Sequence, residues 1–305
     1  MRYLAELLAL CLVAMMGCEA APSARDPGPA AVMATDDVGR DIRLERPARR
    51  VLSLLPAGTE TFFALGAGDA VVGRTRYDVD SGVVHLPSVG GGLDPSLEAI
   101  VALRPDLVVA FETASESRIR PRIEALGIPV FAIQTEDTAD IYRNIASLGA
   151  LVGRGETADS LLSSIRAELS AIRASVSGAD RPKVVYVASI SPPIVAGPGT
   201  YLGELIGVAG GDLLDVGGAQ GAYWPQISLE TLLREQPDLL VLPVGSDPTS
   251  TIGRLRSEPG WRDLEAVKQN RVALVPTDLM SRPGPRIPEI ARLLRDAFVR
   301  TAGNR

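Results

Sequence analysis

The stretch SLEAIVALRPDLVVA at residues 96–110 decides the fold, because a second copy, SLETLLREQPDLLVL, occupies residues 228–242. Seven of the fifteen aligned positions are identical, and the second copy begins 132 residues after the first. Each copy predicts a helix, a Pro-Asp turn and a buried strand. Self-similarity at this distance indicates two lobes that are built alike.

Continuous apolar runs predict further strands that are covered on both faces, as strands of parallel sheets are. Helical patterns separate these runs, so the expected fold class is α/β, with a layered βαβ-type lobe in each half. The predicted strands are residues 51–55, 107–111, 130–133, 184–187, 239–242 and 272–275.

A long helix is predicted between the two halves, over roughly residues 156–177. Apolar side chains recur on one face of it, and Gly178 and Pro182 follow its end. About 21 residues at 1.5 Å each give a length of roughly 31 Å. The duplication favours a single helix joining two lobes; the alternative is an ordinary crossover helix inside one continuous sheet.

The amino terminus has the pattern of a secretory signal. Arg2 precedes a mostly apolar run, residues 4–16, which is too short for a permanent membrane span, and Gly17 and Cys18 follow it. The end of this run resembles a lipobox, in which cleavage leaves Cys18 as a lipidated first residue; a plain signal peptide with an incidental cysteine is the alternative. The Ala- and Pro-rich sequence that follows predicts a flexible tether.

These patterns divide the chain into five parts. Their order is a signal peptide, a lipidated cysteine with its tether, an N-terminal α/β lobe, an interlobe helix and a C-terminal α/β lobe. The predicted ranges are 1–17, 18–48, 49–152, 153–179 and 180–305.

Composition excludes several classes of protein. The formal net charge of −6 argues against binding to nucleic acid, which needs a basic surface. The single histidine, His85, cannot build a multi-histidine metal site, so no metal or cofactor is expected. Nucleotide-binding and nucleophile motifs are absent apart from a poorly spaced Gly197-Pro-Gly199, so an enzyme is not expected, although a dehydrogenase-like protein stays an alternative.

The chain resembles the substrate-binding proteins of ABC importers that have a helical backbone between two lobes, and is most similar to the cobalamin-binding members. The segments that carry the resemblance are residues 72–77, 191–193, 223–228, 277–278 and 285–287, with Arg282. It implies two Rossmann-like lobes, a ligand cleft between them and an extracytoplasmic location, in the periplasm or on the outside of the cell envelope.

The resemblance also implies the ligand and its contacts. A corrinoid would be held by Tyr77, Phe111, Trp224, Asp278 and Arg282, which fall on matching positions. Gly90–Gly92, Ile194, Leu279 and Met280 stand where relatives carry aromatic residues, which leaves haem or a ferric siderophore as the alternative ligand. His85 could also cap a metal centre from one side, but a structural histidine is the simpler interpretation.

Glu98 and Glu230 occupy equivalent positions in the duplication. In the family such a pair docks onto arginines of the membrane permease, so these two residues are expected to set the docking register. A local role is the alternative, since glutamate in a first helical turn is favoured by the helix dipole. The partners implied are the permease, a small chelate ligand and, through Cys18, the membrane, with the chain acting as a monomer; a non-transport envelope lipoprotein is the remaining alternative.

Overall fold

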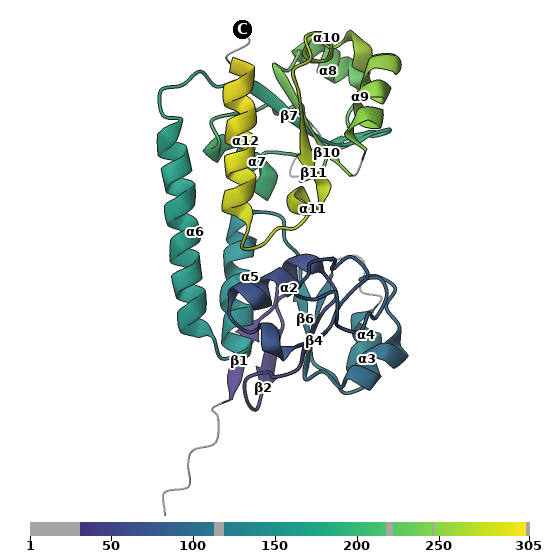
Figure 1. The fold of residues 1–305 in the computed structure, drawn as a ribbon, viewed down its shortest axis with the longest axis vertical. Helices are drawn as coiled ribbons and strands as arrows, with labels where there is room; N and C mark the ends of the chain where they lie inside the picture. The colour runs from purple at the N-terminus through teal and green to yellow at the C-terminus, as the bar shows by residue number, and fades with distance from the viewer. Residues whose placement is uncertain (1–30, 113–118, 218–221, 246, 303–305) are drawn as a thin grey trace, which may run out of the picture.

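The computed structural model describes residues 31–112, 119–217, 222–245 and 247–302. The predicted signal peptide, Cys18 and the first part of the predicted tether lie outside these residues. In the described part, two sheets with flanking helices form two lobes, one above the other in Figure 1. The predicted α/β fold with two lobes is therefore confirmed.

The N-terminal lobe contains a four-stranded sheet in the order β4-β3-β5-β6, with all neighbours parallel. Strand β5 is buried along its length until its last residue, as its continuous apolar sequence predicts. The bounds of the strands are β3 (Val51–Ser53), β4 (Val71–Gly73), β5 (Leu107–Phe111) and β6 (Val130–Ile133).

The C-terminal lobe contains the second sheet, in the order β11-β10-β7-β8, with β9 paired to β7. The first three strands are parallel, and β8 returns antiparallel to β7. The bounds are β7 (Lys183–Ile190), β8 (Pro193–Val195), β9 (Asp212–Leu213), β10 (Leu239–Val244) and β11 (Val272–Pro276).

The duplicated sequence forms the same unit in both lobes, a short helix that leads into a central strand. Helices α3 (Leu97–Leu103) and α8 (Leu229–Glu235) are each capped by the serine before them, whose Oγ accepts a backbone N–H three residues on. Each helix ends at a residue in the left-handed conformation, Arg104 at φ 46° and Gln236 at φ 44°. Similar sequences therefore give the same local structure in both halves.

The Pro-Asp turns have equivalent structural roles. The carboxylate of Asp106 accepts the backbone N–H of Arg50 at 2.9 Å, just before β3. The carboxylate of Asp238 accepts the backbone N–H of Lys183 at 2.8 Å, at the start of β7. Each aspartate thus ties the duplicated unit to the neighbouring strand of its sheet.

Helix α6 (Gly155–Ser175) is the predicted interlobe helix. It runs along one side of the molecule, beside α5 (Thr138–Leu151) and α12 (Ile287–Ala302) (Figure 1). One face of α6 is buried through Ala158, Leu162, Ile165, Leu169 and Ile172. This 3.6-residue spacing explains why the helix packs along both lobes.

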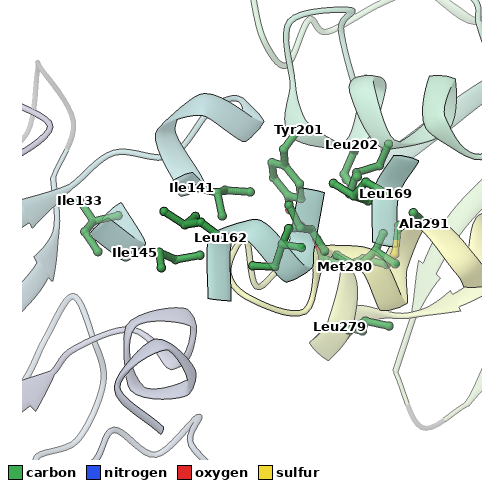
Figure 2. Close-up of a cluster of buried hydrophobic side chains, with 14 of the residues drawn as sticks. Ile133, Ile141, Ile145, Leu162, Leu169, Tyr201, Leu202, Leu279, Met280 and Ala291 are labelled. Carbon is green, nitrogen blue, oxygen red and sulfur yellow. The ribbon is translucent and has the colours of Figure 1, made fainter. Parts of the chain in front are cut away.

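The apolar core continues from one lobe into the other. In Figure 2 the buried side chains extend from Ile133 at the end of β6, through Leu162 on α6, to Met280 in the C-terminal lobe. Tyr201 lies in the same cluster, and its hydroxyl donates a hydrogen bond to the Met280 carbonyl. The lobes therefore share a packed boundary on the side of α6.

Residues 32–44 differ from the sequence expectation, which placed them in the tether. They form an antiparallel hairpin of β1 (Val32–Thr35) and β2 (Asp41–Leu44). Ile42 and Leu44 are buried in the main core, and alternation of buried and exposed residues along β2 fixes its register. The strands are only four residues long and follow an Ala- and Pro-rich stretch, so their short alternation was not recognised as a hairpin.

The remaining helices surround the sheets. No helix in the described part of the chain is both long and apolar enough to cross a membrane. Their bounds are α2 (Pro56–Ala64), α4 (Arg120–Glu124), α7 (Tyr201–Val208), α9 (Pro248–Ser257), α10 (Glu265–Lys268) and α11 (Thr277–Met280), with 3-10 turns at Gly68–Ala70 and Trp261–Asp263.

Candidate functional site

A cavity of about 630 Å³ lies at the carboxyl ends of the N-terminal lobe's strands. Leu54 follows β3, Phe111 ends β5 and Ile133 ends β6, and all three line it. Ser281 and Pro283, which follow α11, line it from the C-terminal lobe, so it is an interlobe cavity. Parallel strands place their carboxyl ends on one edge of a sheet, where open α/β folds bind ligands.

The cavity wall is largely apolar and carries two exposed aromatic rings. Tyr77 is 55% exposed and Phe111 is 46% exposed, although both are large side chains beside a packed core. Leu93, 74% exposed, adds a third apolar surface at the same cavity. Such a group of exposed apolar side chains is typical of a ligand site.

A buried hydrogen-bonded turn holds the loop that carries Tyr77. The carboxylate of Asp78 accepts the backbone N–H of Thr75 at 2.9 Å and its hydroxyl at 2.6 Å. Both residues are almost completely buried. The turn therefore fixes the backbone on either side of Tyr77 while its ring stays exposed.

Arg76 lies at the cavity in contact with Tyr77 and Asp94. Its guanidinium carbon is 5.4 Å from the centre of the Tyr77 ring, and its Nη2 is 3.0 Å from Oδ1 of Asp94. A hydrogen bond with Tyr77, and to a smaller extent one with Asp94, raises the pKa of Arg76 above its ordinary value. At the cavity, the positive charge of Arg76 is thus paired with the negative charge of Asp94.

The glycine run, residues 90–92, shapes another part of the wall. A Cβ atom on Gly92 would lie 2.1 Å from the carbonyl oxygen of Leu54, so no side chain fits there. Gly92 lines the cavity at this close approach. A glycine is required here by the backbone contact itself.

Arg282 connects the two lobes and does not line the cavity. Its Nη1 lies 2.7 Å from Oε1 of Glu60 on α2 and 3.2 Å from Oδ2 of Asp80, and its Nη2 donates to the Tyr77 carbonyl at 3.2 Å. Burial lowers the pKa of Arg282, but Glu60, Asp80 and Asp278 outweigh that effect and raise it above the ordinary value.

Trp224 and Asp278 also lie outside the cavity wall. Trp224 is 36% exposed, meets Tyr186 edge to face at 6.3 Å and forms a hydrogen bond with Glu136. Burial raises the pKa of Glu136 above its ordinary value, against the opposing effect of that bond. Asp278 is exposed in the first turn of α11.

Two of the five predicted ligand contacts, Tyr77 and Phe111, therefore lie together on the cavity wall. The roles of all five stay predictions. The sequence analysis did not identify Leu93 or Asp94 as part of the wall. The only sequence signal for Leu93 is its place after the glycine run.

Leu279 and Met280 are core residues, 5% and 1% exposed. They pack in the interlobe cluster of Figure 2 and do not line the cavity. Leucine and methionine, in place of the relatives' aromatic residues at these two positions, therefore affect the packing of the core and not the cavity wall.

Glu98 and Glu230 are both exposed, in the first turns of α3 and α8. The two helices lie in different lobes, on the side of the molecule away from α6 (Figure 1). Their positions are as equivalent in the structure as they are in the sequence.

His85 lies on a separate cavity of about 490 Å³, with Phe63 and Asp69 among its neighbours, and does not line the interlobe cavity. Among the described residues, no cluster of three or more His, Cys, Asp or Glu side chains could hold a metal ion.

A family model described as periplasmic binding protein matches residues 51–279. The chain is 29% identical over 262 residues to an uncharacterised ABC transporter substrate-binding lipoprotein, YvrC, of Bacillus subtilis, covering 83% of this chain and 81% of the relative. It is 30% identical over 268 residues to a cobalamin-binding protein of Halobacterium salinarum, covering 85% and 72%.

Solved structures share the architecture. The periplasmic heme-binding protein RhuT from Roseiflexus sp. RS-1, in its apo form, superposes with a TM-score of 0.67 at 26% identity, covering 82% of this chain and 99% of that one. The whole two-lobed fold is therefore shared.

Proposed function

We propose that the chain, which belongs to the periplasmic binding protein family, binds a corrinoid in the interlobe cavity. In this family a substrate-binding protein brings a small ligand to the permease of an ABC importer. The chain acts outside the cytoplasm. The observation that carries the proposal is the apolar cavity with Tyr77 and Phe111 exposed on its wall.

A corrinoid suits this wall for physical reasons. It is a broad ring system with an apolar face and an amide-bearing edge, so flat aromatic side chains can contact the face. Leu93 and Pro283 extend the apolar contact, while Thr135 and Ser281 supply hydroxyl groups for amides. The relative in Halobacterium salinarum is named a cobalamin-binding protein, which agrees with this ligand.

We further propose that the C-terminal lobe completes the contact through Trp224 and Asp278, and that Arg282 acts by positioning. Arg282 donates to the backbone carbonyl of Tyr77, so it holds the loop whose ring meets the ligand. Its own guanidinium is already occupied by Glu60 and Asp80.

Haem is the second candidate, and the Arg76–Tyr77 contact favours it. A tyrosine oxygen can ligate haem iron, and a guanidinium can pair with a propionate. Both groups lie on one loop at the cavity. The neighbour from Roseiflexus is named a heme-binding protein.

For delivery, we propose that Glu98 and Glu230 dock onto the permease, one from each lobe. Two exposed carboxylates held on equivalent helices set a fixed register for a basic partner surface. We also propose that Cys18 carries lipid and anchors the chain, since the relative in Bacillus subtilis is named a lipoprotein.

Calorimetric titration with cyanocobalamin, haemin and a ferric siderophore tests the ligand. Saturable binding of cyanocobalamin alone, or far tighter than the others, is the expected result. Preferential haemin binding with a shifted Soret band would replace the corrinoid by haem. Silence with all three compounds would remove both candidates.

A further inference from the structure

A second cavity, separate from the ligand cavity, lies where α5, α6 and α7 meet. Its volume is about 580 Å³. Arg166 and Arg173 line it from α6, seven residues apart and so on one helical face, and Arg181 lines it from the segment that follows α6. Three exposed arginines thus line one concave surface.

These arginines have no acidic partner in the part of the chain that the structure describes. Arg166 lies over the ring of Tyr142 at 4.9 Å, and Nη2 of Arg181 donates to the carbonyls of Gly207 and Gly211. By contrast, Glu168 on the same helix α6 pairs with Arg292 at 2.6 Å. Although the chain has 37 acidic against 31 basic side chains, three arginines without a carboxylate partner among the described residues gather in this one cavity.

The other charged group on the wall is Glu204 of α7. Its Oε2 already accepts the backbone N–H of Thr138 at 3.2 Å and the Thr138 hydroxyl. Three arginines therefore share the wall with one hydrogen-bonded carboxylate, and the cavity is cationic. The hydroxyls of Tyr142 and Ser170 add neutral donors to the same wall.

We propose that this cavity binds a phosphate-bearing anion, either a soluble phosphate ester or the headgroup of an anionic lipid. Guanidinium forks donate in pairs to phosphate oxygens, and a phosphate group offers enough acceptors for several arginines at once. Since the lining residues come from α5, α6 and α7, the bound anion bridges all three helices. The site is independent of the ligand cavity.

The probes are inorganic pyrophosphate, measured by calorimetry on the purified full chain, and vesicles of phosphatidylglycerol with phosphatidylcholine, measured by co-sedimentation. Vesicles of phosphatidylcholine alone are the reference. Each probe is applied to wild type, to Arg166→Gln/Arg173→Gln, and to Arg122→Gln/Arg154→Gln. The last variant removes the same charge from exposed residues outside both cavities.

The cavity variant is expected to lose about tenfold in affinity for the bound probe, while the control variant loses less than about twofold. Binding of pyrophosphate shows that the cavity takes a soluble phosphate-bearing anion, and binding only to anionic vesicles identifies a lipid headgroup. Equal losses in the two variants mean diffuse electrostatics and overturn the proposal. Absence of binding to both probes overturns it as well.

Discussion

Nη1 of Arg282 lies 2.7 Å from Oε1 of Glu60, a residue 222 positions earlier in the chain. The side chains are only 8% and 13% exposed, so the pair is largely removed from water. It joins the segment after α11 to helix α2, and both of these segments also line the interlobe cavity. The helix α6 and this ion pair hold the lobes together at two separate places.

Replacing Arg282 by Met should lower the free energy of unfolding by about 3 kcal/mol, because Glu60 is left buried without its main partner. Arg286, 3.5 Å from the same oxygen, keeps the loss from being larger. Urea unfolding of Arg282→Met and wild type measures this change in the free energy of unfolding. The control is Arg292→Met, which breaks an exposed pair with Glu168 and should cost less than about 1 kcal/mol. Equal losses would mean that Arg282 behaves as a surface charge.

Tyr77 variants should separate the two candidate ligands. If a corrinoid packs on the ring, Tyr77→Phe keeps most of the affinity and Tyr77→Ala loses about tenfold or more. If haem iron binds the phenol oxygen, Tyr77→Phe already weakens binding and alters the haemin spectrum. Calorimetry with cyanocobalamin and absorption spectra with haemin give the two readouts. Unchanged binding of both ligands by Tyr77→Ala would remove Tyr77 from the site.

Reversing both Glu98 and Glu230 to Lys should abolish ligand uptake by cells and leave ligand affinity unchanged. Both residues are exposed and outside the ligand cavity, so the loss would arise at the permease. Glu45→Lys/Glu156→Lys makes the same change of charge at other exposed positions, one of them also in a first helical turn. Normal uptake by the Glu98/Glu230 variant would contradict docking.

Glu136 should make stability depend on pH. Its pKa is raised by burial, so the folded chain binds the proton more tightly than the unfolded chain does. The charged form therefore weakens the fold above the folded pKa, and this penalty disappears as the pH falls below the unfolded value, about 4.3. Glu136→Gln should be more stable than wild type at pH 7, and the difference should shrink towards pH 4. Unfolding curves at both pH values check this; a constant difference would contradict it.

Gly92→Ala should destabilise the fold by about 1–3 kcal/mol, since the new methyl group meets the Leu54 carbonyl. Gly155→Ala is the matched control because nothing lies within 4 Å of its added Cβ atom, and it should be neutral or slightly stabilising. Thermal unfolding measures both. Similar midpoints for the two variants would show that the loop before α3 yields easily.

Much of the fold follows from local sequence. The apolar runs predict β5, β6 and β10 almost residue by residue, and the helical spacing predicts α6, because each pattern acts within one element. The hairpin of β1 and β2 was missed, since its strands are four residues long and lie beside a low-complexity stretch. Short strands carry too little periodicity to be distinguished from a tether.

The candidate site was predicted only in part, for a related reason. Tyr77 and Phe111, which line the cavity, were predicted because they fall on positions that match the family, and Phe111 also ends a predicted strand. Nothing local distinguishes Arg282, whose role depends on Glu60 and Asp80 on a distant part of the chain. Leu93 lines the cavity next to Gly92, whose backbone lies against the carbonyl of Leu54, a residue far away in the sequence.

The sequence by itself determined the two similar lobes, their parallel sheets and the helix between them, because duplication and hydrophobic periodicity are properties of contiguous residues. Only the tertiary structure decided which side chains face the cavity, which arginines are paired across lobes and which are left together in the second cavity. Those outcomes depend on burial and on distances between residues far apart in the chain, and no local pattern encodes either.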